Sequence, residues 1–215
     1  QNDRGTWSRP AEFVLRLDRR PPAITGAPQV LANDHGLVVA VRANEPCFAS
    51  VEYGPTPQYG GLVQTPKLVK RFWDANDGGE WVQTWTIPAA EHALPILAPA
   101  VKTGDTVHLR ITLEDEAGLK TTTEDMTAVV RGPARSVFVA TTGEDAPGRG
   151  SREQPVRTLQ YAVDRALPGD RVVLLPGVYT QLTTLNHGGT AEDARITIEA
   201  EQRVVADEQR APVAR

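Results

Sequence analysis

The segment from Pro155 to Tyr179, PVRTLQYAVDRALPGDRVVLLPGVY, constrains the fold of this chain more than any other stretch. In its first half, apolar residues recur at i, i+3, i+4, i+7 and i+8, which predicts an amphipathic helix over residues 158–167. Pro168 and Gly169 end the helix, and the following run RVVLLPG is apolar on successive residues, which indicates a strand buried on both faces. The apolar positions of the helix are Leu159, Ala162, Val163, Ala166 and Leu167. The segment therefore needs partners that cover the strand from both sides.

Strands are also predicted on either side of this segment. Val137 and Val139 alternate before a loop rich in Gly, Pro and Asp, and the run RITIEA, with Ile196 and Ile198 inward, follows the turn NHGGTAEDA. The pattern from VFVATTG to LLPGVY resembles the start of right-handed parallel β-helix proteins of the pectate-lyase-like superfamily. The resemblance implies that the helix is an N-terminal cap on the open end of the solenoid. It also implies that residues 133–215 hold this cap and the first coil, with any active site on later coils.

Between Ala23 and Val130, short β-type runs are separated by turn signals, which is the spacing typical of an all-β sandwich. The runs are GLVVAVRA, CFASVEYG, EWVQTWTIPA, DTVHLRITLEDEAG and LKTTTEDMTAVV. The turn EDEAG predicts a hairpin in which Gly118 adopts a positive φ.

The same region resembles a known domain family. The segments SVEYGPTPQYG and HALPILAPAVKTGDTVHLRITLEDEAG, with the Pro-Pro pair before them, resemble a fibronectin type III-like domain, as found in bacterial multidomain enzymes and at the front of purple acid phosphatases. The resemblance implies an immunoglobulin-like β-sandwich over residues 21–132. The segment VQTPKLVKRFWDANDGGEW is longer than the usual connection there. A phosphatase is disfavoured, because a solenoid cap follows where a metallophosphatase domain should stand.

The two ends of the chain predict a fragment of a longer protein. Apolar residues alternate in EFVLRL before the Pro-Pro pair, so residues 1–20 are expected to be the last strand of a preceding domain and its linker. The chain opens on Gln1 without a signal peptide, and beyond Ala200 it is highly charged and poor in apolar residues. The expected fold is mainly β: an immunoglobulin or fibronectin III-like sandwich, then the truncated start of a right-handed parallel β-helix with an N-terminal capping helix.

Composition disfavours two classes of partner. The formal net charge is −4 and the pI is about 5.6, so no basic surface is expected that would bind nucleic acid or anionic lipid. No apolar run approaches the roughly 18 residues that a membrane-spanning helix needs. The single cysteine, Cys47, lies in an apolar strand pattern and is expected to be a buried, inert thiol. A chain without disulfides argues against a eukaryotic extracellular module and is compatible with an exported bacterial protein.

Three patterns that could bind ligands have simpler explanations. Gly143 and Gly148 have the spacing of a phosphate loop, but the lysine and the hydroxyl residue are missing, so a solvated turn is expected. The run DANDGGE, from Asp74 to Glu80, gathers oxygen ligands for calcium but lacks the spacing of an EF-hand, and it predicts a hairpin tip. No paired spacing of histidines is present, which predicts no transition-metal site, and the last histidine is expected in a solenoid turn. The histidines are His35, His92, His108 and His187.

Trp73, at the edge of a loop, is the candidate for contact with a sugar ring. Trp81 and Trp85 share one face of their strand and are expected in the core of the sandwich. No catalytic pair is assigned, because the carboxylates in EDE at 114–116 and EDA at 192–194 lie in turns, where such residues are usually solvated.

The expected function is that of a secreted or cell-surface bacterial carbohydrate-active protein, in which the sandwich is an accessory spacer ahead of a β-helix polysaccharide lyase or hydrolase domain. In a lyase of this kind, a basic residue removes the proton next to a uronic carboxylate, and calcium or another cation neutralises that carboxylate. Those groups are expected on later coils, so this chain should hold no cofactor or metal and should be inactive alone. Flanking domains and a polysaccharide are the expected partners. The alternative is a non-enzymatic surface or adhesion protein with a structural β-solenoid.

Overall fold

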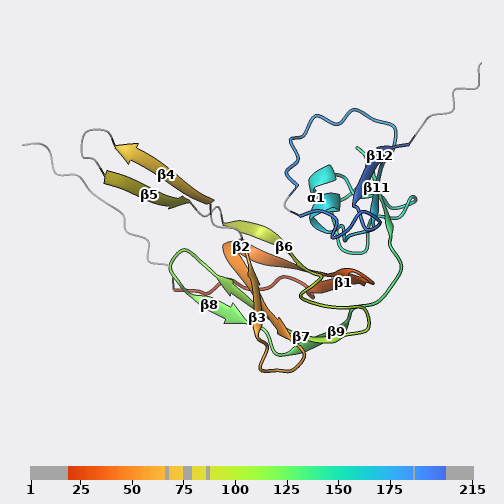
Figure 1. Cartoon of the computed structure of the whole chain (residues 1–215). Coiled ribbons are helices and arrows are strands. Elements are labelled where there is room, and N and C mark those ends of the chain that lie inside the picture. The colour runs from red at the N-terminus through yellow and green to blue at the C-terminus, as the bar shows by residue number, and fades with distance from the viewer. Residues whose placement is uncertain (1–18, 66–67, 75–78, 86–87, 186, 202–215) are drawn as a thin grey trace, which may run out of the picture.

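The computed structural model describes residues 19–65, 68–74, 79–85, 88–185 and 187–201, and for the strands at 68–74 and 79–85 it describes the backbone alone. The described chain is mainly β-strand, as expected, and has an antiparallel part followed by a smaller parallel part (Figure 1). The strand expected within residues 1–20 lies outside the described residues.

A curled antiparallel sheet is built around one long strand, β2 (Gly36–Gly54). Its first half pairs with β1 and β6, and its second half pairs with β3 and β7, with a register shift between Arg42 and Cys47. The change of neighbours along β2 makes the sheet curl over its own core. The other strands of this sheet within the described ranges are β1 (Gln29–Asn33), β3 (Gly61–Gln64), β6 (Ala89–Leu97), β7 (Thr106–Glu114), β8 (Lys120–Thr122) and β9 (Met126–Val129).

The core of the antiparallel part follows from strand periodicity. In β7, every second residue is buried, so one face of the strand is apolar and the other faces solvent. These residues pack against the buried side chains of both halves of β2 in one cluster. The buried residues of β7 are Val107, Leu109, Ile111 and Leu113. The predicted turn after β7 is confirmed: Gly118 has a φ of 81°, and its N–H donates to the Asp115 carbonyl at 3.1 Å.

The strands β4 (Leu68–Asp74) and β5 (Gly79–Trp85) form a separate two-stranded hairpin, in which Phe72 pairs with Trp81. Figure 1 shows this hairpin standing away from the rest of the sheet. The run EWVQTWTIPA was expected to supply a strand of the sandwich; the strand forms as β5, but within the described residues it pairs with β4 and not with the curled sheet. β4 and β5 follow each other closely in the sequence and can form a hairpin by themselves. Such local pairing costs less loop entropy than joining the curled sheet.

The parallel part contains three strands in register within the described residues: β10 (Ser136–Val139), β11 (Arg171–Leu174) and β12 (Thr197–Ala200). The helix α1 (Leu159–Asp164) lies between β10 and β11 in sequence, and its buried residues pack with Val139 and Val172 in a second core cluster. It begins as predicted, because the Thr158 hydroxyl accepts from the Tyr161 N–H at 3.1 Å. It ends earlier than predicted, since Arg165 already takes the C-cap position.

The strand β12 forms within the predicted run RITIEA, but only one of the two isoleucines of that run is covered. Ile196 packs against the second cluster, whereas Ile198 is 39% exposed and its prediction as an inward residue was wrong. Ile198 pairs with Val172, which is fully buried, so the exposure comes from the position of β12 at the edge of the described sheet.

Replacing Leu109 by Ala should lower the free energy of unfolding by about 2–5 kcal/mol, because Leu109 is fully buried and the truncation leaves a cavity. The control Leu62→Ala removes the same atoms from a side chain that is 59% exposed, and should change it by less than about 0.5 kcal/mol. Denaturant unfolding of both variants measures the difference. Equal losses would show that the curled sheet does not enclose this core.

Candidate functional site

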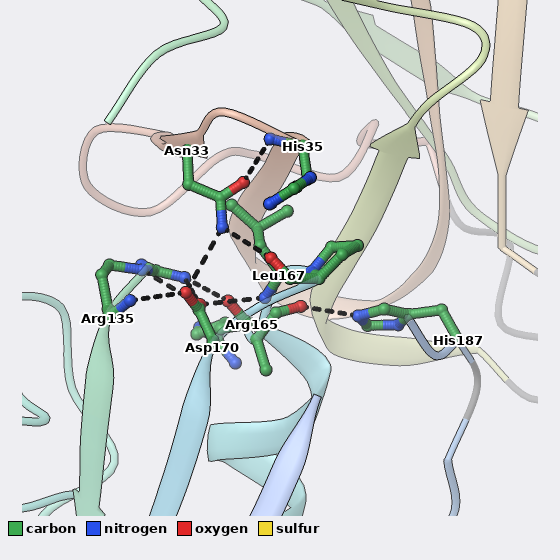
Figure 2. A network of polar contacts seen from close by, with 9 residues as sticks. Asn33, His35, Arg135, Arg165, Leu167, Asp170 and His187 are labelled. Carbon is green, nitrogen blue, oxygen red and sulfur yellow. Dashed lines mark hydrogen bonds and ion pairs between the residues drawn. The ribbon is translucent and has the colours of Figure 1, made fainter. Parts of the chain in front are cut away.

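A network of polar contacts lies where the two parts meet, and it centres on Asp170 (Figure 2). Asp170 directly precedes β11 and is fully buried. Its carboxylate accepts from the backbone N–H of Arg135 at 2.7 Å, from Arg135 Nε at 3.1 Å and Nη2 at 2.5 Å, and from the Leu167 N–H at 3.0 Å. A buried charge is stable only when it is paired and hydrogen-bonded, and Asp170 meets both conditions.

Asn33, the last residue of β1, carries the network into the antiparallel part. Its side chain is fully buried, and Nδ2 donates to the Pro168 carbonyl at 2.9 Å and to Asp170 Oδ1 at 3.4 Å. Its Oδ1 accepts from the His35 N–H at 2.8 Å, which closes the turn between β1 and β2. A single amide therefore ties this turn to the turn that precedes β11.

The backbone around Asp170 explains why this turn contains glycine. Gly169 has a φ of +88°, which non-glycine residues rarely adopt, and a Cβ there would lie 3.4 Å from both His35 Cδ2 and Ala134 Cβ. The Asp170 N–H donates to the Leu167 carbonyl at 2.9 Å, and its carbonyl accepts from Thr197 N–H at 3.0 Å. Asp170 thus fixes the end of the helix segment and the register of β12 together.

Two further contacts complete the network at the end of α1. Arg135 Nη2 also donates to the Arg165 carbonyl at 2.9 Å, and His187 Nε2 donates to the Ala166 carbonyl at 2.7 Å (Figure 2). These carbonyls lie at the helix terminus, where backbone acceptors lack partners within the helix. His187 was expected in a turn, and it lies in the connection between β11 and β12, where it holds that connection onto α1.

Beside this network lies a seam, formed by Arg42 and Glu91 of the antiparallel part and by Tyr161 and Arg165 of the parallel part. Glu91 pairs with Arg42 and lies 3.7 Å from Arg165 Nη2, and the Arg165 guanidinium is 3.5 Å from the centroid of the Tyr161 ring. Burial lowers the pKa of Arg165 and raises that of Tyr161. A pocket of about 540 Å³ is lined by Arg42, Tyr161 and Arg165, with Pro28 and Pro147. The contact between Glu91 and Arg165 joins the two parts by charge, and the Tyr161 ring supports the Arg165 guanidinium within the parallel part.

The loop 143–154, compared above with a phosphate loop, has a different role. Asp145 lies in it, and its carboxylate accepts from the N–H groups of Arg157 and Thr158 at 2.8 and 2.9 Å and from the Thr158 hydroxyl at 2.7 Å. These bonds hold the start of α1. The loop therefore supports the helix by a side chain that sequence reasoning did not single out.

The candidate Trp73 lies on β4, where its backbone pairs with Glu80. For Trp73, Trp81 and Trp85 the structure describes the backbone alone. Sugar contact at Trp73 and core packing of the other two therefore stay predictions. Most of the run from Asp74 to Glu80, at residues 75–78, lies outside the described residues.

Cys47 is buried, as predicted. Its Sγ lies 3.6 Å from Nε2 of His92, whose Nδ1 lies 3.5 Å from the Thr65 hydroxyl. Burial, and then the charges of Glu45 and Asp115, raise the pKa of the thiol, while burial lowers the pKa of His92. Both shifts favour the neutral pair, and a nucleophilic cysteine would need the opposite shift and access to solvent.

The carboxylates expected to be solvated do not all behave alike. Glu192 pairs with Arg195 at the surface, as a turn residue does. Asp115 is only 6% exposed, which corrects the prediction: its Oδ1 accepts from the Leu119 N–H at 2.8 Å, whereas Oδ2 has no partner among the described residues. Within the described ranges no three metal-binding side chains come together.

Comparison with known proteins gives little to set beside this geometry. No protein-family model and no curated protein matches the chain. A purple acid phosphatase isolated from yellow lupin (Lupinus luteus) seeds is similar in structure with a TM-score of 0.32 and 14% identity. The match covers 69% of this chain and 28% of the phosphatase chain, and at this level it says nothing of function. In the part of the chain that the structure describes, no helix is both long and apolar enough to cross a membrane.

Replacing Asp170 by Ala should lower the free energy of unfolding by about 3–5 kcal/mol, because it leaves Arg135 and several N–H groups without their acceptor. The control Glu192→Gln removes a surface carboxylate that pairs with Arg195 and should cost less than about 0.5 kcal/mol. Thermal and denaturant unfolding measure both. A loss for Asp170→Ala no larger than the control would refute the structural role of the network.

His92 should make stability depend on pH. The pKa of His92 in the folded state lies below its unfolded value of about 6.5. The contribution of neutral His92 to the free energy of unfolding is therefore complete above that pH and is lost as the pH falls toward the folded pKa. The variant His92→Gln cannot take up the proton. We expect the stability advantage of wild type over this variant to shrink between about pH 7.5 and pH 5, as measured by denaturant unfolding. An advantage that is constant or grows toward acid pH would contradict the burial of neutral His92.

Proposed function

We propose that this chain is a fragment of a secreted or cell-surface bacterial protein that acts on polysaccharide. In this proposal, the antiparallel part is a fibronectin type III-like sandwich, and the parallel part is the cap and first coil of a right-handed parallel β-helix. The sandwich serves as an accessory module ahead of the β-helix. Catalytic residues and any calcium belong to further coils of that domain.

The observation that carries the proposal is the pair of connections in the parallel part. Parallel strands require a crossover, and in most proteins each crossover contains a helix. The connection from β10 to β11 contains α1, but the described residues of the connection from β11 to β12 form no helix. Strand positions that stay in register across β10, β11 and β12 without alternating helices are typical of a solenoid coil.

Exposed apolar side chains in the connection from β11 to β12 also support this proposal. Val178, Leu182 and Leu185 are 82%, 93% and 63% exposed, and Ile198 at the edge strand is partly open. Solenoid repeats bury apolar residues against the neighbouring repeat, so an open connection and an open isoleucine on the edge strand are consistent with a stack that grows from β12.

The network at Asp170 supports the role of the antiparallel part as an accessory module. It joins β1, the end of α1 and the start of β11 through one buried carboxylate and one buried amide. Such a joint fixes the direction in which the solenoid extends from the sandwich, which a flexible linker would not do.

The experiment compares residues 1–215 with the protein purified from its natural source at its natural length. Both are given pectate, alginate and neutral polysaccharides, and product is followed by the absorbance of unsaturated uronates and by reducing ends. We expect turnover by the natural protein and background rates for residues 1–215, because the proposal places the catalytic residues on further coils.

The other outcomes are also informative. Turnover by residues 1–215 alone would place the active site within this chain and overturn the accessory role. Binding to polysaccharide without turnover by the natural protein would favour the adhesion alternative. A natural protein that is retained in the cytoplasm would contradict the proposed location.

A further inference from the structure

A second hollow, far from Asp170 in sequence, lies at the loops of the antiparallel part. We call it the end-loop pocket; it has a volume of about 670 Å³ and lies between the loop from β2 to β3 and the loop from β6 to β7. Its volume is within the range of small-molecule sites. Its lining includes Tyr53, Gly54, Tyr59, Gly61, Asp105 and Thr106.

Tyr59 in this pocket has an unfavourable backbone conformation. Its φ is 57°, in the left-handed region, and it is the one residue other than glycine with a positive φ among the described residues. A bulky residue there is strained, and glycine or asparagine would fit better. The use of tyrosine indicates that its side chain has a role that offsets the strain.

The side chain of Tyr59 is held in place by its neighbours. Its hydroxyl donates to Asp125 Oδ1 at 3.0 Å, and Asp125 Oδ2 lies 2.7 Å from His108 Nδ1. The Arg110 guanidinium lies 4.8 Å from the ring centroid and is itself fixed by a bond from Nε to Glu52 Oε2 at 2.9 Å. The ring is therefore ordered before any ligand arrives.

Two glycines allow the aromatic residues to pack closely at this end. A Cβ at Gly61 would lie 2.3 Å from Tyr53 Cζ, and a Cβ at Gly54 would lie 2.4 Å from the Tyr59 carbonyl oxygen. Both contacts are far too short for any other residue. The loop sequence thus brings Tyr53 and Tyr59 into the lining of one pocket, each in a restricted position.

The polar groups at the pocket suit an uncharged ligand. The exposed Thr106 offers a hydroxyl, and the exposed Asp105, whose Oδ2 accepts from the Lys102 N–H at 2.8 Å, offers carboxylate oxygens. Asp105 is the one charged side chain in the described lining, and it disfavours a second carboxylate. Sugar rings have apolar faces that pack on aromatic side chains and hydroxyls that bond to polar groups at the edge.

We propose that the end-loop pocket binds a neutral sugar unit of a polysaccharide, with Tyr53 and Tyr59 as the aromatic contacts. Only the choice of polysaccharide as the source of the sugar rests on the function proposed above. The antiparallel part is then a binding module that holds the chain on its polymer, in addition to its role as a spacer.

The test uses residues 1–215 and a panel of soluble neutral glycans: glucan, mannan, galactan and chitin oligosaccharides, with oligogalacturonate as the acidic arm. Calorimetric titration and NMR chemical shifts follow binding. We expect at least one neutral glycan to bind with a Kd of about millimolar or tighter and to shift the ring resonances of Tyr53 and Tyr59. Oligogalacturonate should bind more weakly, and Asp105→Asn should reduce that difference.

Two matched variants separate binding from folding. Tyr59→Asn keeps a residue that tolerates the left-handed backbone but removes the ring, and should weaken binding at least about tenfold while the chain remains folded. Tyr59→Phe keeps the ring but loses the bond to Asp125, and should retain binding within about threefold. Tyr53→Leu tests the second ring with the Tyr59 network intact, and Gln58→Ala, at an exposed neighbour, is the control.

The proposal is overturned if no neutral glycan in the panel binds, or if glycan binding survives both Tyr59→Asn and Tyr53→Leu. A loss of stability in Tyr59→Phe with glycan binding absent in wild type would show that the tyrosine serves the fold alone. Turnover by the natural-length protein combined with no binding here would reject this pocket and leave the proposed function standing.

Discussion

The buried carboxylate of Asp170 is the contact on which the arrangement of the described chain depends. Three residues donate hydrogen bonds to this side chain: Arg135, Leu167 and Asn33. Arg135 precedes β10, Leu167 follows α1, and Asn33 belongs to the antiparallel part. Moving an ionised group out of water is unfavourable by several kcal/mol of free energy, and only full hydrogen bonding offsets this. Because the donors come from three separate segments, the carboxylate is satisfied only when all three are assembled, which makes the junction specific as well as stable.

The parts of the fold that the sequence predicted are those where local patterns and tertiary packing agree. The apolar stripe from Leu159 to Leu167 gave the helix, the run at Arg171–Leu174 gave a buried strand, and Gly118 gave the turn after β7. The long strand β2 was read as two strands, GLVVAVRA and CFASVEYG, because the irregular stretch between Arg42 and Cys47 breaks the alternation. Its continuity depends on neighbours that are distant in sequence.

The polar junction could not be predicted in the same way. Asn33, Arg135 and Asp170 are spread over more than a hundred positions and follow no spacing rule, so their meeting depends on the packing of two sheets. In the sequence, the run LPGD at residues 167–170 indicates only the end of a helix, through Pro168 and Gly169. The positive φ of Gly169 and the burial of Asp170 show that the same four residues also position the junction. In the end-loop pocket, the strained Tyr59 could not be predicted either, since a positive φ is expected at glycine and no sequence pattern indicates it at a tyrosine.

The length of β2 has a consequence for how the chain is made. Its partners β1, β3, β6 and β7 span residues 29 to 114, so the strand cannot complete its hydrogen bonds until β7 has left the ribosome. Pairing across such separations slows folding, and the edges of an unpaired apolar strand attract other chains in the meantime. After β2, about 60 further residues must be translated before β7 is complete, at roughly 5–20 residues per second. The hydrogen bonds of β2 stay incomplete during that time. During that interval, a protein that binds and covers the unpaired strand would protect the chain from aggregation.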